Sequence, residues 1–106
     1  MKQNLHNRIV HNRMRRSPGY RRAFLRNVRQ INLAMLVREM REAANLSQKQ
    51  LAERAGTTQS AIARLEDAEY TGHSLKTLET IAIACGVSLR IHARKKPDLD
   101  RELVLV

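Results

Sequence analysis

The chain has 106 residues, 42% of them hydrophobic, a length that suits one domain with a single core and excludes a large enzyme cleft between two domains. Lys and Arg number 20 against 10 Asp and Glu, so the formal net charge is +10 and the expected partner is a polyanion, either nucleic acid or an acidic membrane surface. Aromatic residues make up only 3%, which disfavours domains that bind single strands by stacking bases on aromatic rings.

The positive charge gathers in the first third of the chain. Residues 1–31 contain nine basic residues and no acidic one, a net of +9, whereas residues 32–106 carry a net of +1. Residues 1–16 have only scattered apolar side chains and cannot bury a face on their own. We therefore predict a basic N-terminal arm over 1–16, in which Arg13, Arg15 and Arg16 are candidates for phosphate contacts.

A helix is predicted to begin after this arm, because Ser17 and Pro18 suit the N-cap and the first helical position. Apolar residues then recur at steps of four and three, as in an amphipathic helix: Tyr20, Phe24, Val28, Ile31 and Met35. We interpret the apolar stripe of Tyr20, Phe24 and Val28 as a core or dimer contact and assign 17–31 to a helical extension. Two alternatives stay open, one long helix to about Ala44 or a break near Asn32.

Residues 32–86 are predicted to form a helical domain, in the middle of which the starts and ends of short helices are clearly marked in the sequence. Ser47 and Gln50 form a capping-box pattern that opens a short helix, and Gly56 closes that helix. The residues of this helix expected to face inward are Leu51, Ala52 and Ala55.

The next helix is predicted over residues 58–67, with Ile62 and Leu65 facing inward. The positions of this helix that are expected to face outward are Gln59, Ser60, Ala63 and Arg64. After a loop, Ser74 is a further N-cap, and Gly86 ends the helix that it opens. The buried face of that last helix is expected to comprise Leu75, Leu78, Ile81, Ala82 and Cys85.

Residues 87–106 change to a period of two, in which Val87, Leu89 and Ile91 alternate with polar residues. This alternation predicts a half-buried strand, which needs a partner for its backbone groups. Two alternatives for this partner stay open. In the first, residues 102–106 fold back and form a hairpin with the strand. In the second, the same strand of a second subunit pairs with it, and Val87, Leu89 and Ile91 form a dimer strand.

Two short helices joined by a turn at Gly56 are typical of a helix-turn-helix, whose second helix lies in the DNA major groove. The stretch from about Leu33 to Leu89 resembles the lambda-repressor/Cro (XRE) family of helix-turn-helix proteins. The matching segments are VREMREAANLSQKQLAERAGTTQSAIARLE and SLKTLETIAIACGVSL. The resemblance implies an all-α fold of five helices, here with an N-terminal helical extension and a C-terminal β-strand.

The resemblance also implies roles for individual side chains. Gln48 would contact a phosphate and support Gln59, which would read a base through the bidentate hydrogen bonds that Gln makes with adenine. Further DNA contacts would come from Thr58, Ser60, Ala61 and Arg64. Arg41 and Glu66 would form a structural ion pair between the first helix and the second helix of the motif. Lys49 and Lys76 are added as candidate phosphate contacts.

The ending GVSLRIHARKK after such a domain resembles the antitoxins of type II toxin–antitoxin modules, of the HigA and HipB kinds. The expected function is thus a homodimeric repressor of a palindromic double-stranded operator, and an antitoxin that neutralises a protein toxin and autoregulates its operon. A freestanding phage- or plasmid-type XRE regulator without a toxin is the alternative. From another class, the fold would serve only as the scaffold of a basic protein that binds RNA or a membrane.

The sequence lacks the residue patterns that metal binding, catalysis or a membrane span would require. Cys85 is the only cysteine and the four histidines have no metal spacing, so we expect no disulfide, metal or cofactor. No catalytic constellation is recognisable, so we expect no enzymatic activity. No apolar run approaches the ~18 residues of a membrane span, and no secretory signal is recognisable, which favours a cytoplasmic protein.

Overall fold

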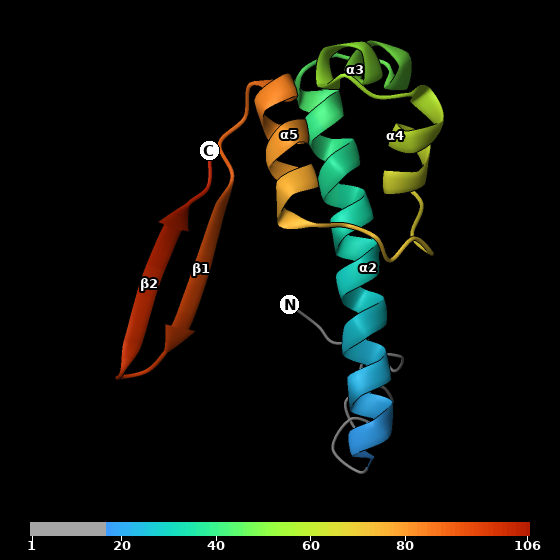
Figure 1. The fold of residues 1–106 in the computed structure, drawn as a ribbon. Coiled ribbons are helices and arrows are strands. Elements are labelled where there is room, and N and C mark those ends of the chain that lie inside the picture. The colour runs from blue at the N-terminus through green and yellow to red at the C-terminus, as the bar shows by residue number, and fades with distance from the viewer. Residues whose placement is uncertain (1–16) are drawn as a thin grey trace, which may run out of the picture.

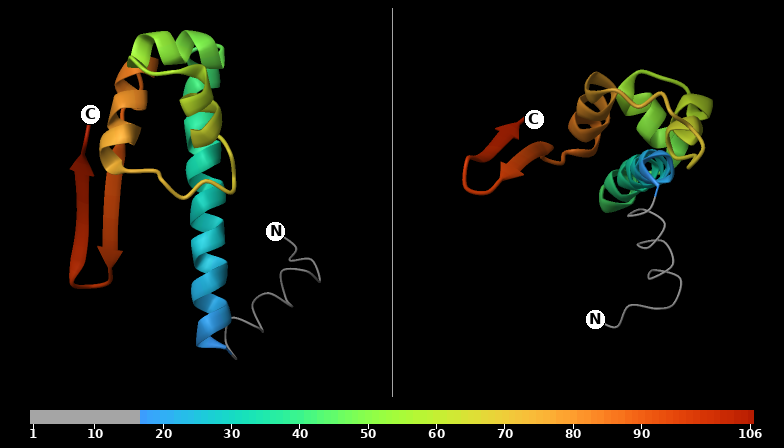
Figure 2. Two further views of the ribbon diagram at one scale, coloured as in Figure 1. Left: turned by 45° about the vertical axis from the view of Figure 1, so that its right-hand side comes forward. Right: turned by 90° about the horizontal axis from the view of Figure 1, so that it is seen from below.

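A computed structural model describes residues 17–106, so the predicted arm and its candidates Arg13, Arg15 and Arg16 lie outside the described residues. Figure 1 shows the elements in chain order: α2 (Pro18–Ala43), α3 (Gln48–Ala55), α4 (Gln59–Leu65), α5 (Leu75–Cys85), β1 (Arg90–Lys95) and β2 (Leu99–Val104). The four helices pack together, and the two strands form a separate hairpin beside them (Figure 2).

α2 is one continuous helix of 26 residues that passes through Asn32 without a break. Ser17 caps it, since its Oγ accepts a hydrogen bond from the Tyr20 backbone N–H, and Pro18 occupies the first turn. Of the two alternatives for this segment, the single long helix is confirmed. The C-terminal part of α2 packs in the helical domain, whereas its N-terminal part extends beyond it (Figure 1).

The face of α2 that enters the core differs from the apolar stripe seen in the sequence. Ala34, Val37 and Met40 are the buried residues of α2, whereas Ile31 and Met35 of the stripe are exposed. Ile31 and Met35 therefore lie outside the core of the chain, and a dimer contact of the stripe stays a prediction. The reason is that α3, α4 and α5 are attached to one end of α2 and cover only the face carrying the buried three.

The core lies between the C-terminal part of α2 and the other three helices. Its members are Val37, Met40, Leu46, Leu51, Ala52, Ile62, Leu65, Leu78, Ile81, Ala82 and Cys85. The inward faces predicted for α3 and α4 are thus confirmed, apart from Ala55, which is only half-buried. Leu75 is exposed, contrary to prediction, because it is the first residue of α5 and lies beyond the region that the other helices cover.

The C-terminal residues form an antiparallel hairpin in which Arg90 pairs with Val104 and Lys95 with Leu99. The predicted half-buried strand is wrong in two respects. Every residue of both strands is exposed, because no helix packs over either face. Strand β1 also begins at Arg90 instead of Val87, since Val87 and Leu89 pack against the core and connect it to the hairpin.

The five helices expected of the domain are not all found among the described residues. Residues 17–106 contain four helices, because the chain after Gly86 turns into the hairpin instead of a further helix. None of these four helices is both long enough and apolar enough to cross a membrane.

Candidate nucleic-acid interface

The turn between α3 and α4 is built by local hydrogen bonds. The Gln50 N–H donates to Ser47 Oγ at 3.0 Å and the Ser47 N–H donates to Gln50 Oε1 at 2.8 Å, which completes the predicted capping box. At the other end Gly56 has φ +71°, a left-handed conformation that glycine adopts at little cost. This conformation directs the chain sharply out of α3 and into α4.

α4 presents a polar face outward. Its N-cap is Thr58, whose Oγ1 accepts from the Ala61 N–H at 3.1 Å. Ile62 and Leu65 anchor the opposite side in the core. The outward side chains predicted from the sequence are exposed, namely Gln59, Ser60, Ala63 and Arg64. An amide, a hydroxyl and a guanidinium on one rigid helix are the groups that hydrogen-bond base edges in a major groove.

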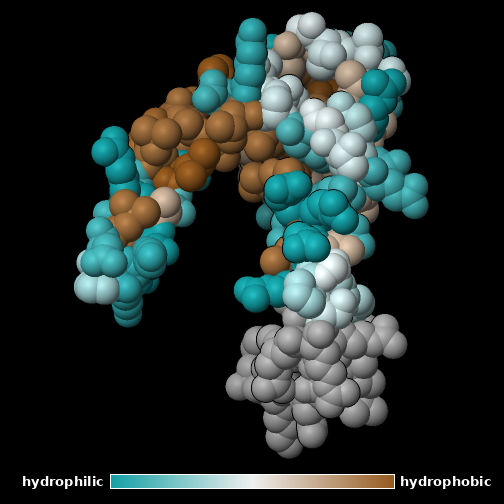
Figure 3. Space-filling view, turned by 60° about the horizontal axis from the view of Figure 1, so that its bottom comes forward, coloured by the Kyte–Doolittle hydropathy of each residue, from teal (hydrophilic) through white to brown (hydrophobic). Residues whose placement is uncertain are grey.

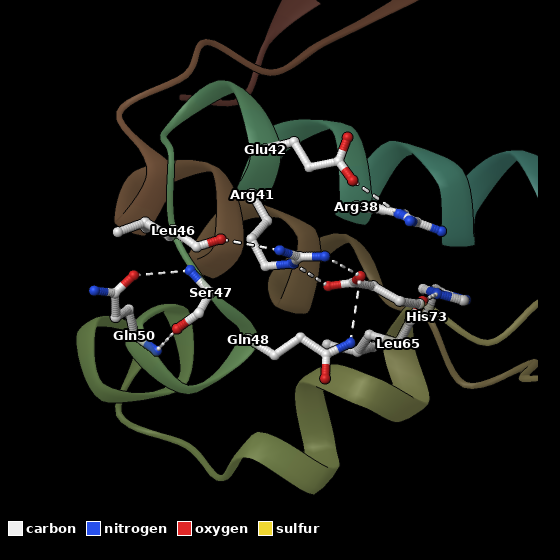
Figure 4. Close-up of polar contacts among 10 residues, drawn as sticks. Arg38, Arg41, Glu42, Leu46, Ser47, Gln48, Gln50, Leu65 and His73 are labelled. Atoms are coloured by element: carbon white, nitrogen blue, oxygen red, sulfur yellow. Dashed lines mark hydrogen bonds and ion pairs between the residues drawn. The ribbon is translucent and has the colours of Figure 1, made fainter.

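An ion pair fixes the end of α4 to α2. Arg41 Nε donates to Glu66 Oε2 at 2.8 Å and Arg41 Nη2 donates to Glu66 Oε1 at 2.9 Å, a bidentate pair (Figure 4). The third donor, Arg41 Nη1, bonds the Leu46 carbonyl at 2.9 Å. The side chains are only 15% and 6% exposed, and the hydrogen bond to Glu66 raises the pKa of Arg41. Arg41 thus joins α2, the loop before α3 and the end of α4.

Gln48 is the first residue of α3, and its side chain reaches the same carboxylate. Its Nε2 lies 3.5 Å from Glu66 Oε1, a long hydrogen bond that holds the amide beside α4 (Figure 4). Within residues 17–106 no hydrogen bond joins Gln48 to Gln59. Glu66 is therefore bonded both by Arg41 of α2 and by Gln48 of α3, so the ion pair helps to position the Gln48 side chain.

His73 holds the other side of the C-terminal end of α4. Its Nε2–H donates to the Leu65 carbonyl at 2.7 Å, and its ring meets the edge of the Tyr70 ring at a centroid distance of 5.2 Å. The Nδ1 atom is buried without a partner among the described residues. The sequence places His73 in a surface loop, but in the structure it packs this loop against the last turn of α4.

The charge of the motif is close to balanced. Residues 45–72 contain three basic and four acidic residues, a net of −1. Glu66 is already neutralised by Arg41, which lies outside this range, so the remaining charges sum to zero. Because non-specific affinity for DNA comes largely from the neutralisation of phosphates, the motif by itself supplies little of it.

A hollow of about 310 Å³ lies between α3, α4 and α5, and Arg64 lines it. Three threonines share this lining with apolar residues, namely Thr57, Thr77 and Thr80. Sequence analysis missed these threonines, because they come from separate parts of the chain and form no motif.

The remaining candidates lie in different places. Lys49 and Lys76 are exposed, on α3 and near the start of α5. Val87 and Leu89 precede the hairpin and contact the core, whereas Ile91 is an exposed residue of β1. Within residues 17–106 no group of three or more His, Cys, Asp or Glu side chains is placed to hold a metal ion.

Comparisons with known proteins agree with this geometry. A family model described as helix-turn-helix matches residues 37–91, slightly more than half of the chain. Comparison with curated proteins and with solved structures found no match. The matched region runs from the buried part of α2 to the start of β1 and contains the whole interface described above.

Proposed function

The chain belongs to the XRE family of helix-turn-helix proteins and is a DNA-binding transcriptional regulator, and from this premise we propose that it is a sequence-specific repressor that reads its operator with α4. The observation that carries the proposal is the outward face of α4. Gln59, Ser60 and Arg64 are exposed there, while two buried residues of the same helix hold it rigidly on the core.

Each of these side chains has a distinct role in the proposal. The Gln59 amide accepts from adenine N6–H and donates to adenine N7, and the Arg64 guanidinium donates to guanine O6 and N7. Thr58, Ser60 and Ala61 complete the contact with the groove. Gln48, Lys49 and Lys76 contact the flanking phosphates, which set the register of the protein on the duplex.

The basic residues before α2 supply the affinity that the balanced motif lacks. Arg13, Arg15 and Arg16 are proposed phosphate contacts, which makes binding depend on salt. Deletion of residues 1–16 is therefore expected to weaken binding and to lower the slope of log K against log salt. An unchanged slope would show that this segment contacts no phosphate.

The repressor is proposed to act as a homodimer on a palindromic operator. A two-fold dimer presents two copies of α4 to half-sites about 34 Å apart, one helical turn of DNA. The regulation of its own promoter is the form of repression that we propose.

A gel shift with the DNA upstream of the gene tests the reading of bases by α4. Gln59→Ala removes one bidentate contact with a base. Such a contact contributes about 1–3 kcal/mol to the discrimination between the correct and a wrong base, so the affinity for the specific site is expected to fall about tenfold or more. Gln30→Ala on α2 is the matched control, since it makes the same chemical change on another helix, beside the loop that follows α4 and not on the outward face of α4. Equal binding by both variants would refute the role of Gln59.

We propose further that the protein is the antitoxin of a type II toxin–antitoxin module. The support is the resemblance of the C-terminal segment GVSLRIHARKK. Co-expression with the neighbouring gene tests it, and a stable complex that restores growth is expected. If no complex forms and the neighbour is harmless, the freestanding XRE regulator remains the function.

A further inference from the structure

A gap separates α4 from α5. Figure 1 shows the two helices on either side of α2, with α3 across their ends. Both pack against α2 and α3, but they make at most a slight contact with each other. The hollow of about 310 Å³ lies in this gap, and we call it the α4–α5 pocket. Its volume is at the lower end of the range of pockets that hold small molecules.

The walls of the α4–α5 pocket are held in place by the fold. Leu65 of α4 and Ile81 of α5 belong both to the lining and to the buried core. Tyr70 lines the pocket from the loop after α4, and its ring is held by the edge contact with His73. The Tyr70 hydroxyl group lies against Gly72, where the absence of a side chain leaves room for it. The pocket is therefore formed before any ligand enters.

The lining is chiefly apolar, and its charge comes from one cation. Thr77 Oγ1 is already hydrogen-bonded to Ser74 Oγ at 2.9 Å. Thr80 Oγ1 donates to the Lys76 carbonyl at 3.0 Å. No acidic residue belongs to the lining, whereas two further hollows beside α2 each include at least one glutamate. The charge of the α4–α5 pocket thus comes from Arg64 and suits an anion.

Arg64 lies at the boundary between the pocket and the outward face of α4. On a helix of 3.6 residues per turn it shares one side with Ala61 and Leu65, which also line the pocket. It is also one turn from Ser60 of the outward face. Within residues 17–106 its guanidinium has neither a hydrogen bond nor an ion pair. If the guanidinium turns into the pocket to bind an anion, it is withdrawn from the DNA groove.

The pocket is distinct from the larger apolar surface of the molecule. In Figure 3 that surface gathers toward the hairpin, whereas the side of α4 is mostly polar or intermediate in hydropathy. Within the pocket, Leu65 and Ile81 form a buried apolar floor, and Arg64 and Thr80 are exposed at the mouth. Such a site suits a small molecule that is apolar at one end and negatively charged at the other.

We propose that the α4–α5 pocket binds a small organic monocarboxylate, which weakens the binding of DNA by α4. The carboxylate accepts two hydrogen bonds from the Arg64 guanidinium, and the apolar body of the ligand lies on Leu65 and Ile81. A doubly charged phosphate would meet a single cation and an apolar floor, which disfavours it. The inference rests on the proposed function, in which Arg64 reads a guanine, and adds its regulation.

An NMR titration of the full-length chain with hexanoate, without DNA, tests the binding. Hexanoate is expected to shift the amide signals of Ala55 and Thr80, which line the pocket, and to saturate with a Kd of about 1 mM. Acetate lacks the apolar body and 1-hexanol lacks the charge, so each is expected to bind about tenfold more weakly or less. Equal binding by acetate, or no saturable shift at these residues, would overturn the site.

Thr80→Phe narrows the mouth of the pocket and is expected to raise the Kd of hexanoate about tenfold or more. Thr71→Phe is the matched control, because it makes the same change at an exposed threonine outside the lining and is expected to alter the Kd by at most about twofold. Circular dichroism verifies that both variants keep their helices. Equal effects of the two substitutions would contradict the assignment.

Arg64→Gln tests the cation independently of the packing around Thr80. Loss of the guanidinium is expected to raise the Kd of hexanoate about tenfold or more, while 1-hexanol binds as it does to the wild type. Unchanged binding of hexanoate would show that Arg64 does not hold the carboxylate.

A gel shift with the upstream DNA tests the regulation. Saturating hexanoate is expected to lower the affinity of the wild type for DNA about tenfold, the effect of one lost bidentate base contact, and acetate at the same concentration controls for ionic strength. Thr80→Phe is expected to bind DNA equally with and without hexanoate. An unchanged wild-type affinity would overturn the regulatory role. A lack of specific DNA binding without hexanoate would instead refute the proposed repressor, whereas the titration, which contains no DNA, decides the pocket by itself.

Discussion

Arg41 offers the sharpest test of how α4 is held against α2, because Arg38 of the same helix α2 provides a control. Arg41→Ala removes three donors at 2.8–2.9 Å and leaves the Glu66 carboxylate, only 6% exposed, with the long contact to Gln48. Removal of one partner from a buried pair typically costs 3–5 kcal/mol. Since Arg41 is 15% exposed, we expect the lower end, about 3 kcal/mol.

Arg38→Ala breaks the ion pair between Arg38 and Glu42, which lie one helical turn apart on α2. The two side chains are 65% and 54% exposed. Such an exposed pair contributes about 0.3–0.5 kcal/mol. The two variants thus differ by several-fold in cost, although both delete an arginine from α2. A double variant, Arg41→Met with Glu66→Leu, replaces the buried pair with apolar groups and is expected to recover much of the loss.

Urea unfolding followed by circular dichroism gives the free energy of unfolding of each variant, and urea avoids the screening that guanidinium would cause. At about 4–8 °C per kcal/mol, Arg41→Ala lowers the Tm by about 12 °C or more. The reasoning is refuted if Arg41→Ala and Arg38→Ala cost the same, or if the Arg41 and Glu66 substitutions are simply additive.

Three further outcomes follow from local features. Gly56→Ala is expected to destabilise the fold by about 1–2 kcal/mol because φ is +71° there, although no atom lies within 4 Å of the added Cβ. Gly19→Ala, inside α2, should stabilise the fold by up to about 1 kcal/mol. Thermal melts that show the same sign of stability change for both variants would contradict this expectation. Ser47→Ala should cost about 1 kcal/mol in the same melts through the lost cap, and no change would show that the capping box is dispensable. The Cys85 thiol should resist alkylation in the native protein and react in urea, since burial raises its pKa, whereas equal rates in both states would show that it is accessible.

The helix boundaries could be predicted well because their signals are local. Ser47, Thr58 and Ser74 each accept a hydrogen bond from the backbone three residues later, and Gly56 and Gly86 end their helices in a left-handed conformation. Neither signal depends on the rest of the chain. The outward face of α4 follows from the same periodicity, since Ile62 and Leu65 leave only one side free.

The exposure of Ile31 and Met35 could not be predicted, because two faces of α2 are apolar. Met35 and Val37 both look like core residues in the sequence, yet only Val37 is buried. Which face is covered depends on where α3, α4 and α5 attach, and that is a property of the packed domain.

The residue pattern alone was enough to predict the helix-turn-helix, with its caps, its turn at Gly56, the polar face of α4 and the candidate pair of Arg41 and Glu66. Only the tertiary structure showed that this pair also holds Gln48, and that the C-terminal strand pairs within the chain. The difference has a physical reason. Caps and periodicity are interactions between residues a few positions apart, whereas the contacts of Glu66 with Arg41 and Gln48 arise only when segments distant in the sequence are brought together.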